Sequence, residues 1–417
     1  MFEETHDDDL ALFQLPEFET GTQKTDWITY NPINQLTAGS AIEFTVPGTS
    51  ISYIDLRRTL LSLKLKIVKN DGTDIVQGDK VGLVNAPLHS VFSQVDFNVQ
   101  QQPTTETGTN YPYKAYLDLL LDSTDQHELN GQCFNMDTSG SVDVTDPSDT
   151  NSGLFDRAAF TKEGGVLDVI GRLHVDVCQQ DRFLLNGVPL NIKLWQSTDP
   201  FRLSADKSDE AYRVKILEAS LRVAMVKVNP GVIIGHAEAL KTSETLYPYT
   251  RSVIKTYAVP SGQYSFTADD LFQGEVPKRL IVGLVSSSAT HGSYVKNPFN
   301  FHHYNCNYAG FFVNSQSTPS HPLQPNYEGN QFIEAYHRLT SCHINRAVTL
   351  SRKDFKSGSS LYVFDPDGDY KDRVNERAHT RLELKFAKPL PEACTVIVYA
   401  KFAALMKIDS SRNVFLE

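Results

Sequence analysis

Apolar and polar residues alternate along several short stretches of the chain, which is the two-residue period of strands with one buried face. The first half shows this pattern at 61–67, 95–99 and 190–194, and the second half shows it at 382–386 and 396–402. Turn-forming residues separate the stretches. Many short strands divided by turns favour β-sandwiches or jelly rolls over alternating strand and helix units.

Three further stretches extend the pattern. Alternation at 167–177 and a short apolar run at 280–285 predict two strands, and a long β-prone run at 212–228 predicts a third. The phase of the long run slips near Ile216 and Leu217, which predicts a β-bulge.

Each half also holds one stretch with a helical period, in which apolar residues fall at i, i+3, i+4 and i+7. Pro112 stands where the first turn of such a helix tolerates proline. The two stretches lie about 220 residues apart, so each half repeats the order strands, helix, strands without residue-level identity. The apolar residues are Tyr113, Tyr116, Leu117 and Leu120 in the first half, and Phe332, Ala335, Tyr336 and Leu339 in the second.

The length predicts two domains, because a single hydrophobic core stops growing at about 250–300 residues and the chain has 417. The acidic run at 7–9 belongs to a segment that cannot form its own core, and the Gly-, Ser- and Asp-rich stretch 131–165 is expected to be a long exposed loop. The polar stretch 204–210 is a candidate linker. The expected parts are an N-terminal arm at 1–30, a first sandwich at 31–208, a second sandwich at 209–410 and a C-terminal tail at 411–417.

Composition narrows the function classes. Hydrophobic residues make up 40% and charged residues 21%, which is the balance of a folded globular protein. With 39 Lys and Arg against 50 Asp and Glu, the net charge is -11, which disfavours binding to phosphate backbones or anionic membranes over the whole surface.

The five cysteines are widely spaced, odd in number and without a C-x-x-C pair, which predicts reduced thiols in an intracellular folding compartment. No apolar run approaches the roughly 20 residues of a membrane span. The acidic N-terminus lacks the signature of a signal peptide. We therefore expect assembly in the cytoplasm or nucleus.

His302, His303 and Cys306 have the residue types of a zinc site, but no second ligand pair stands at a defined spacing. An aromatic, polar loop with a buried thiol is the favoured interpretation. A second candidate is an acidic cluster that could wrap calcium, although its glycine precedes the third acid instead of following it, so a plain turn is favoured. Its acids are Asp365, Asp367, Asp369 and Asp372.

Nucleophile chemistry has little support. His236, Ser341, Cys342 and His343 supply suitable residue types, but no G-x-S-x-G context surrounds them. A P-loop and a G-x-G-x-x-G motif are both absent from the sequence. We therefore predict no catalytic, cofactor-binding or metal-binding residues, and a protein that is not an enzyme.

Two small basic groups are expected to be solvated faces, with contact to packaged DNA as the alternative. They are Arg57 and Arg58, and Arg352, Lys353 and Lys356.

Seven motifs resemble the major capsid proteins of Polinton (Maverick) elements and of the related adintoviruses. The run 181–194, with the sequence DRFLLNGVPLNIKL, resembles the block that closes the first jelly roll in that family. The others are YRVKI at 212–216, VNPG at 228–231, LYPY at 246–249, VPKRLIVG at 276–283, NPFNFH at 297–302 and EAY at 334–336.

The resemblance in the order of the elements extends over roughly residues 30–410. It implies an all-β chain of two tandem eight-stranded jelly rolls, with short helices in the loops. It implies a homotrimer that forms a pseudo-hexagonal capsomer of an icosahedral shell. The implied partners are neighbouring capsomers, penton and minor capsid proteins, and packaged double-stranded DNA on the inner face; no cofactor is implied. The implied location is the virion.

Two other functions stay open. A carbohydrate-binding or carbohydrate-cleaving β-sandwich would use exposed aromatic platforms, for which Trp27 and Trp195 are the available tryptophans. A cellular descendant of a capsid gene would keep the same fold.

Overall fold

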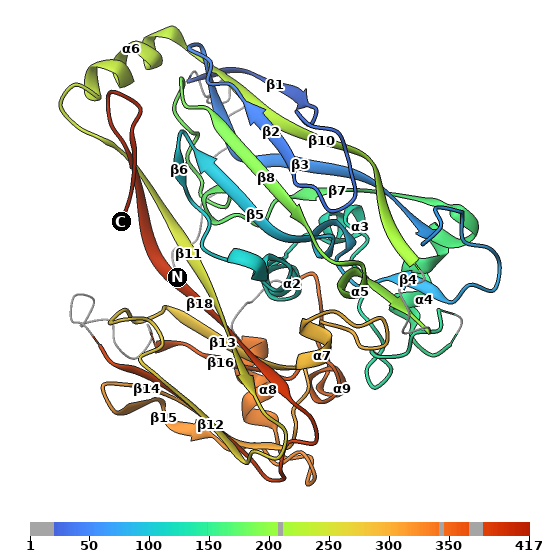
Figure 1. Cartoon of the computed structure of the whole chain (residues 1–417). Coiled ribbons are helices and arrows are strands. Elements are labelled where there is room, and N and C mark those ends of the chain that lie inside the picture. The colour runs from blue at the N-terminus through green and yellow to red at the C-terminus, as the bar shows by residue number, and fades with distance from the viewer. Residues whose placement is uncertain (1–20, 148, 207–211, 342–345, 367–377) are drawn as a thin grey trace, which may run out of the picture.

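The computed structural model describes residues 21–417 except 148, 207–211, 342–345 and 367–377. Two β-sandwiches lie one above the other, and the long strands β11 and β18 run between the two lobes (Figure 1). Each sandwich consists of two antiparallel sheets, which have four strands each except for one five-stranded sheet in the second sandwich.

The first sandwich is formed by sheets with the orders β1-β10-β3-β7 and β2-β8-β5-β6. We call the first of these the β10 sheet. The strands are β1 Thr22–Tyr30, β2 Ile42–Val46, β3 Ser52–Lys69, β5 Phe92–Val99, β6 Gln102–Pro103, β7 Val166–Arg172, β8 Leu190–Gln196 and β10 Tyr212–Val228. A separate two-stranded sheet pairs β4 Val81–Leu83 with β9 Leu203–Ala205.

The second sandwich has the sheet orders β11-β18-β13-β16 and β12-β17-β14-β15, and β19 is added beside β18. The strands are β11 Thr245–Val259, β12 Ser265–Asp269, β13 Arg279–Ser286, β14 Cys306–Val313, β15 Gln316–Leu323, β16 Leu361–Phe364, β17 Thr380–Phe386, β18 Cys394–Ile408 and β19 Val414–Leu416.

Both sandwiches have the same topology. When the eight sandwich strands of each half are numbered in chain order, one sheet reads first, eighth, third, sixth and the other reads second, seventh, fourth, fifth. This is the eight-stranded jelly roll, and the chain contains it twice. The predicted fold class, two tandem jelly rolls with short helices in the loops, is confirmed.

The two predicted amphipathic helices are α2 and α8, and each lies in the connection between the fifth and sixth strands of its jelly roll. Their equivalent positions explain the spacing of about half a chain between them. The α-helices are α1 Pro87–Ser90, α2 Tyr111–Leu121, α3 Gln126–Gly131, α4 Ser152–Thr161, α5 Asp199–Arg202, α6 Pro230–Ala239, α7 Ser287–Thr290, α8 Ile333–Ser341 and α9 Arg352–Lys356. Short 3₁₀ turns stand at Gly108–Asn110, Lys162–Gly164 and Asp176–Cys178.

Two hydrophobic cores are present, one centred on each jelly roll, and each also includes residues of the other, such as Tyr247 and Met406 in the first core and Tyr113 and Tyr116 in the second. In β3 the alternation places Leu61, Leu63 and Leu65 inside, all at 0% exposure. In β13 every residue from Leu280 to Ser286 is buried. The predicted bulge in β10 is confirmed, since its register with β3 shifts between Ile216 and Glu218.

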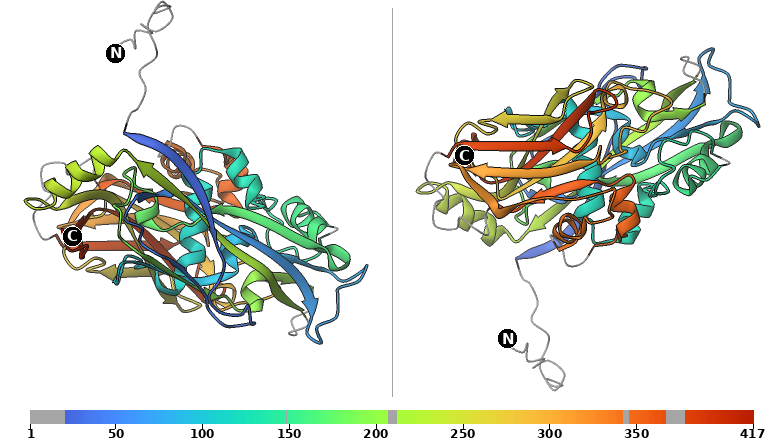
Figure 2. Two further views of the ribbon diagram at one scale, coloured as in Figure 1. Left: turned by 90° about the horizontal axis from the view of Figure 1, so that it is seen from above. Right: turned by 90° about the horizontal axis from the view of Figure 1, so that it is seen from below.

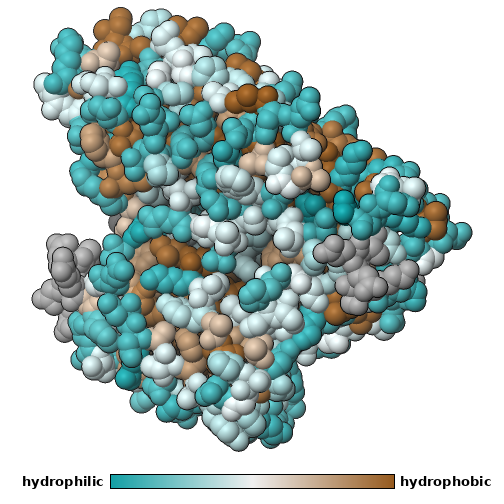
Figure 3. All heavy atoms as spheres, in the orientation of Figure 1, coloured by the Kyte–Doolittle hydropathy of each residue, from teal (hydrophilic) through white to brown (hydrophobic). Residues whose placement is uncertain are grey.

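Polar residues cover most of the face in Figure 3, and apolar residues lie between them singly or in small groups. In the part of the chain that the structure describes, no helix has the length and apolarity of a membrane span.

The pairing of the strands leads us to propose domain limits that differ from the expected ones at three places. Residues 22–30 form β1, the first strand of the first jelly roll, so the arm does not reach residue 30, and its residues 1–20 lie outside the described residues. The expected tail pairs with β18 through β19. β10 pairs with β1 and β3, so we propose that the division falls between β10 and β11 and not at 208.

These differences have physical causes. β1 is an edge strand that is half exposed on both faces, so it shows no alternation. The stretch 131–165 holds the helix α4, which Asn151 caps by accepting a hydrogen bond from the Leu154 amide. The sequence of the stretch 131–165 is rich in loop-forming residues, whereas α4 within it is buried on one face by contacts with β4 and β7.

Candidate functional site: the junction between the jelly rolls

Helix α2 lies between the two sandwiches (Figure 1) and carries a buried ion pair. The Lys114 ammonium lies 2.7 Å from Asp118 Oδ2, one turn away, and 3.1 Å from Asp176 Oδ1. All three side chains are at most 4% exposed. Charges this deeply buried are stable only when each has a partner.

The second jelly roll supplies further partners to the same carboxylates. The Tyr399 hydroxyl of β18 donates to Asp118 Oδ1 at 2.6 Å, and the Lys401 ammonium lies 3.8 Å from the same oxygen and also pairs with Asp122. The Ser252 amide of β11 donates to Asp176 Oδ2 at 2.8 Å. We call Lys114, Asp118, Asp176, Tyr399 and Lys401 the junction network, because it ties the first jelly roll to the second.

The network changes the acidity of its members. Burial alone would raise the pKa of Asp118, but Lys114 beside it holds that pKa well below the ordinary value. Burial alone would lower the pKa of Lys114, but the carboxylates of Asp118 and Asp176 raise it. Both groups therefore stay charged at neutral pH.

An aromatic cluster lies beside the network and also spans the junction. The ring of Tyr116 stacks on that of Phe299 from the second jelly roll, with centroids 4.3 Å apart and planes 3° from parallel. Tyr113 and Phe201 meet Phe299 edge-on at 5.8 and 6.1 Å. Such pairs stabilise beyond the area that they bury.

A third link joins the stretch 131–165 to the second jelly roll. Arg157, 1% exposed, donates to Asp137 Oδ1 at 2.7 Å and to two backbone carbonyls. Asn297 donates to Asp137 Oδ2 at 2.9 Å, and Asn300 donates to Asp143 Oδ2 at 2.7 Å. This stretch is thus part of the junction.

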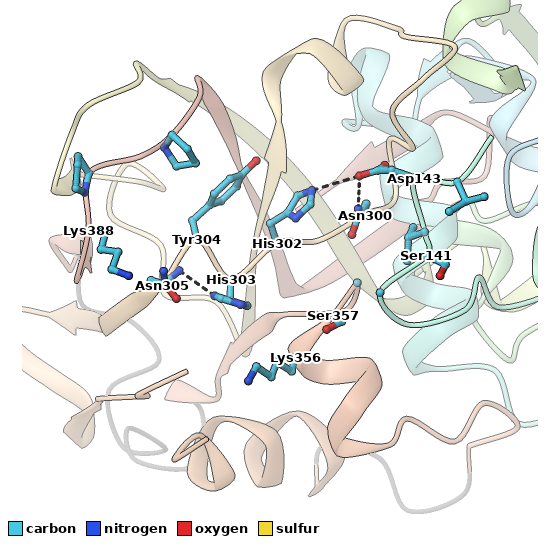
Figure 4. Close-up of a pocket in the computed structure, with 16 residues that line it drawn as sticks. Ser141, Asp143, Asn300, His302, His303, Tyr304, Asn305, Lys356, Ser357 and Lys388 are labelled. Carbon is cyan, nitrogen blue, oxygen red and sulfur yellow. Dashed lines mark hydrogen bonds and ion pairs between the residues drawn. The ribbon is translucent and has the colours of Figure 1, made fainter. Parts of the chain in front are cut away.

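A cavity of about 700 Å³ opens where residues 140–144 meet the second jelly roll (Figure 4). His302 points toward Asp143, with Nε2 3.9 Å from Oδ2. His303 Nδ1 accepts a hydrogen bond from the Asn305 amide at 2.8 Å, and its ring stacks on Tyr327.

The side chains of His302, His303 and Cys306 do not converge as metal ligands would. Cys306 is fully buried and contacts the Tyr308 carbonyl through Sγ, and burial raises the pKa of its thiol to about 11. Burial and nearby Lys356 lower the pKa of His303 to about 4. Outside the gaps in the structure, no three His, Cys, Asp or Glu side chains are grouped to hold a metal ion.

The cavity also lacks the geometry of a nucleophile site. Among the described residues, no hydrogen bond joins the imidazole of His302 or His303 to a hydroxyl or thiol. Lys356 donates to Asn330 and Lys388 pairs with Glu328, each at 2.5 Å. The lining therefore offers polar contact surface, without an activated attacking group.

The other candidate residues are dispersed. His236 of α6 bonds the Tyr53 hydroxyl at 2.8 Å, whereas Ser341 donates to a carbonyl of its own helix α8 in the other jelly roll. Cys342 and His343 lie outside the described residues, as do Asp367, Asp369 and Asp372 of the acidic cluster. Asp365 pairs with Arg279 at 2.7 Å.

The described cysteines are four buried free thiols, as expected for reduced cysteines. They are Cys133, Cys178, Cys306 and Cys394.

Both tryptophans are partly exposed, and a cation covers a face of each. Arg58 lies over Trp27 with its guanidinium 5.0 Å from the ring centroid, and Lys193 lies 5.1 Å over Trp195. A sugar platform needs a free aromatic face, so this arrangement does not favour carbohydrate binding.

The basic residues that were predicted to form solvated faces have different environments in the structure. Arg57 pairs with Asp181 at 2.6 Å on the surface. Arg352 lies over the Phe332 ring, and Lys356 faces the cavity.

The junction residues were not predicted from the sequence. The signal was present in α2, where Lys114 and Asp118 stand four residues apart inside an almost wholly apolar helix. An i, i+4 pair of this kind is usually on a surface, so the pattern alone did not distinguish burial from exposure. The sequence around Arg157 contains no comparable pattern.

Acidification below pH 6.5 is expected to destabilise the protein through His89, which is 0% exposed. Its ring nitrogens contact the Tyr111 hydroxyl at 2.9 Å and Gln132 Oε1 at 2.6 Å, and its ring packs edge-on against His174. Burial, reinforced by His174, lowers the pKa of His89 well below 6.5, although Asp118 opposes this. Folded His89 is therefore neutral and takes up a proton on unfolding.

The stability tied to His89 is complete above pH 6.5 and falls by about 1.4 kcal/mol per pH unit below it. Denaturant unfolding at pH 7, 6 and 5 measures this slope. Glutamine at position 89 binds no proton, so in His89→Gln the free energy of unfolding should fall less steeply with decreasing pH, by the amount that one proton contributes. His127→Gln, a change at an exposed position, should keep the slope of the wild type. An equal slope in both variants would contradict the assignment.

Comparison with known proteins gives a consistent result for the fold. No protein-family model matches the chain. An uncharacterized protein of Caenorhabditis elegans, F54H12.2, is 24% identical over 427 residues, an alignment that covers 97% of this chain and 99% of that protein.

Three solved structures are similar over nearly the whole chain. A chain of the Sputnik virophage has a TM-score of 0.64 at 12% sequence identity and covers 98% of this chain and 92% of its own length. The mavirus major capsid protein has a TM-score of 0.57 at 13% identity, with coverage of 94% and 90%. A chain of the PBCV-1 virus capsid has a TM-score of 0.57 at 11% identity, with coverage of 97% and 98%. At these identities the similarity shows a shared double jelly-roll fold.

Proposed function

We propose that the chain is a major capsid protein that forms pseudo-hexagonal trimeric capsomers of an icosahedral shell. The observation that carries the proposal is the identical jelly-roll topology of the two halves, locked together by a buried junction. A rigid protomer with two similar lobes contributes two of six lobes to a trimer, and six lobes fit a hexagonal lattice site. The fold is shared over at least 90% of the compared virophage, mavirus and PBCV-1 chains.

We assign the role as structural and not catalytic. The cavity residues are engaged in packing and hydrogen bonds, and of the candidate residues that the structure describes, Ser341 donates to a carbonyl of its own helix and His236 bonds the Tyr53 hydroxyl. The protein would then be located in the virion, after assembly in the host cytoplasm or nucleus. Its partners would be its own copies, neighbouring capsomers, penton and minor capsid proteins, and packaged double-stranded DNA.

The finer assignment is to the capsid proteins of Polinton or Maverick elements and adintoviruses. Its support is the set of motifs between 181 and 336. Further support is a relative of nearly equal length in an animal, Caenorhabditis elegans, which suits a gene carried in cellular genomes.

Light scattering on the purified protein is expected to give a mass near three times the chain mass of 46.6 kDa, or about 140 kDa. Negative-stain images should show a pseudo-hexagonal outline. A monodisperse monomer at high concentration, across salt and pH, would contradict the proposal and would make a glycan screen the next experiment.

A further inference from the structure

The outward side of the β10 sheet carries cations that the described residues do not neutralise. Arg213, Lys215 and Arg222 are exposed and form no ion pair within the part of the chain that the structure describes. Residues 213 and 215 precede the bulge of β10 and residue 222 follows it. Because the bulge shifts the phase by one residue, all three side chains lie on the same side of the sheet.

The rest of this outward side is mixed in charge and partly apolar. Lys64 pairs with Glu218 at 2.7 Å and Lys66 with Asp74 at 2.8 Å, so these cations are already matched. Asp168 stands opposite Lys64 in the register of β7. Exposed apolar side chains lie among the charges: Trp27 at 46%, Leu217 at 37% and Val166 at 45% exposure. The surface therefore combines an excess of positive charge with apolar contact area.

The chain contains one segment with the opposite character. Residues 1–20 hold seven of the 50 acidic residues and none of the 39 Lys and Arg. The other 397 residues are close to balance, with 43 acidic and 39 basic residues. The segment also contains six large apolar residues, namely Phe2, Leu10, Leu12, Phe13, Leu15 and Phe18. Its charge and its apolar content both complement the outward side of the β10 sheet.

The direction of β1 fixes the end of the sheet at which the segment is attached. Thr22 pairs with Val228, and the Asn229 amide donates to the Gly21 carbonyl at 2.9 Å, so the chain before β1 leaves the sheet at the end where α6 begins. Arg222 and Arg213 lie in the other direction along β10, about 20 and 50 Å from that end at about 3.3 Å per residue. Viewed from above (Figure 2, left), β1 lies on the outside of the molecule, open to a neighbour.

We propose that the outward side of the β10 sheet binds the acidic N-terminal segment, residues 1–20, of a second copy of the chain. The proposal rests on the self-association proposed above and assigns one of its contacts. For the segment to reach its own Arg213, the chain would have to reverse at Gly21 and lie fully extended. A neighbouring copy has no such constraint.

A nucleic acid fits this surface less well. A protein that binds the DNA backbone neutralises about 6–10 phosphates, whereas four cations lack an acidic partner among the described residues here, namely Arg213, Lys215, Arg222 and Arg58, which lies over Trp27. Glu218 and Asp168 lie among them and would repel phosphates. An acidic and apolar peptide uses both the cations and the exposed apolar side chains.

A zero-length carbodiimide cross-link tests the contact directly on the full chain. Copies grown in ¹⁴N and ¹⁵N media are mixed under conditions that allow exchange of protomers and then cross-linked, and peptides are identified by mass spectrometry. We expect amide links between the Lys215 amine and the carboxylates of residues 7–9, with mixed isotopes. Their yield should fall about tenfold in R213E/R222E, because the like charges repel the segment.

Two further variants make the test specific. K278E/K353E makes the same change of charge at exposed positions of the second jelly roll and should keep the yield. Adding D8K/D9K to R213E/R222E should restore links to Asp7, because the charges are then exchanged between the two surfaces.

The outcomes separate this proposal from the capsid assignment. A trimer mass without links at Lys215 would overturn the contact and leave the proposed function standing. Links between like isotopes alone would show that the segment binds its own chain and would also overturn the proposal. Loss of the links when a 20-base-pair DNA duplex binds the wild type, but not R213E/R222E, would assign the surface to nucleic acid and overturn it too. A monomeric protein without cross-links at Lys215 would overturn both this contact and the proposed function.

Discussion

Replacing Lys114 by methionine is expected to lower the free energy of unfolding by about 3–5 kcal/mol, because it leaves two buried carboxylates without their cation. Asp118 and Asp176 are 3% and 4% exposed, so water cannot replace the lost ammonium. The junction network joins the two jelly rolls through Tyr399 and Lys401, so we also expect unfolding to separate into two transitions. Chemical denaturation followed by circular dichroism and by tryptophan fluorescence measures both effects.

The matched control is Lys241→Met, which removes an exposed pair with Glu238. Exposed pairs contribute about 0–1 kcal/mol, so this variant should unfold like the wild type. If Lys114→Met were as mild as Lys241→Met, the buried charges would not hold the junction. Coincident transitions in Lys114→Met would show that the network stabilises the first jelly roll alone.

Replacing Phe299 by alanine is expected to cost about 3–5 kcal/mol, since it removes a fully buried ring and leaves a cavity against three aromatic neighbours. Phe299 is 1% exposed and is contributed by the second jelly roll, whereas Tyr113, Tyr116 and Phe201 come from the first. The variant should also lower the yield of trimers, because lobes that move relative to each other present no fixed contact surface.

Phe155→Ala provides the comparison, since Phe155 is 56% exposed on α4. Its cost should be within about 0.5 kcal/mol. Thermal unfolding and light scattering on the same samples give stability and trimer yield together. A destabilised Phe299→Ala that still forms trimers in full yield would show that assembly does not need the aromatic contact between the lobes.

Local patterns along the chain predicted much of the fold. The two-residue period identified β3, β5, β8 and β17, because each has one face against a core and the other toward more polar surroundings along much of its length. It also identified β18, although both faces of that strand are buried from Cys394 to Ala400. The helical period identified α8, which has one buried face, and α2, which shows the period although all of its residues are buried between the two sandwiches. The phase slip in β10 revealed the bulge, since a bulge moves the following side chains to the other face.

Elements without a one-sided environment were not predictable in this way. β1 is an edge strand with both faces half exposed, so its residues show no period and were assigned to an arm. The helix α4 was missed for a different reason: one of its faces is buried against β4 and β7, but Phe155 and Phe160 lie on the exposed side and Arg157 on the buried side, so its apolar residues show no helical period.

The amino-acid sequence by itself determined the number of jelly rolls, the place of most strands and the acidity of residues 1–20. Tertiary structure alone decided which strands pair, where the chain divides and which charges are buried. Strand β10 is first in sequence after the expected boundary, yet it completes the first sandwich by pairing with β1 and β3. Asp118 and Tyr399 are 281 positions apart, and a contact over that separation exists only because two sandwiches pack against one helix. The hydrophobic period and the composition of a segment depend on the local surroundings of its residues. Which residues distant in the chain come into contact depends on how the elements pack.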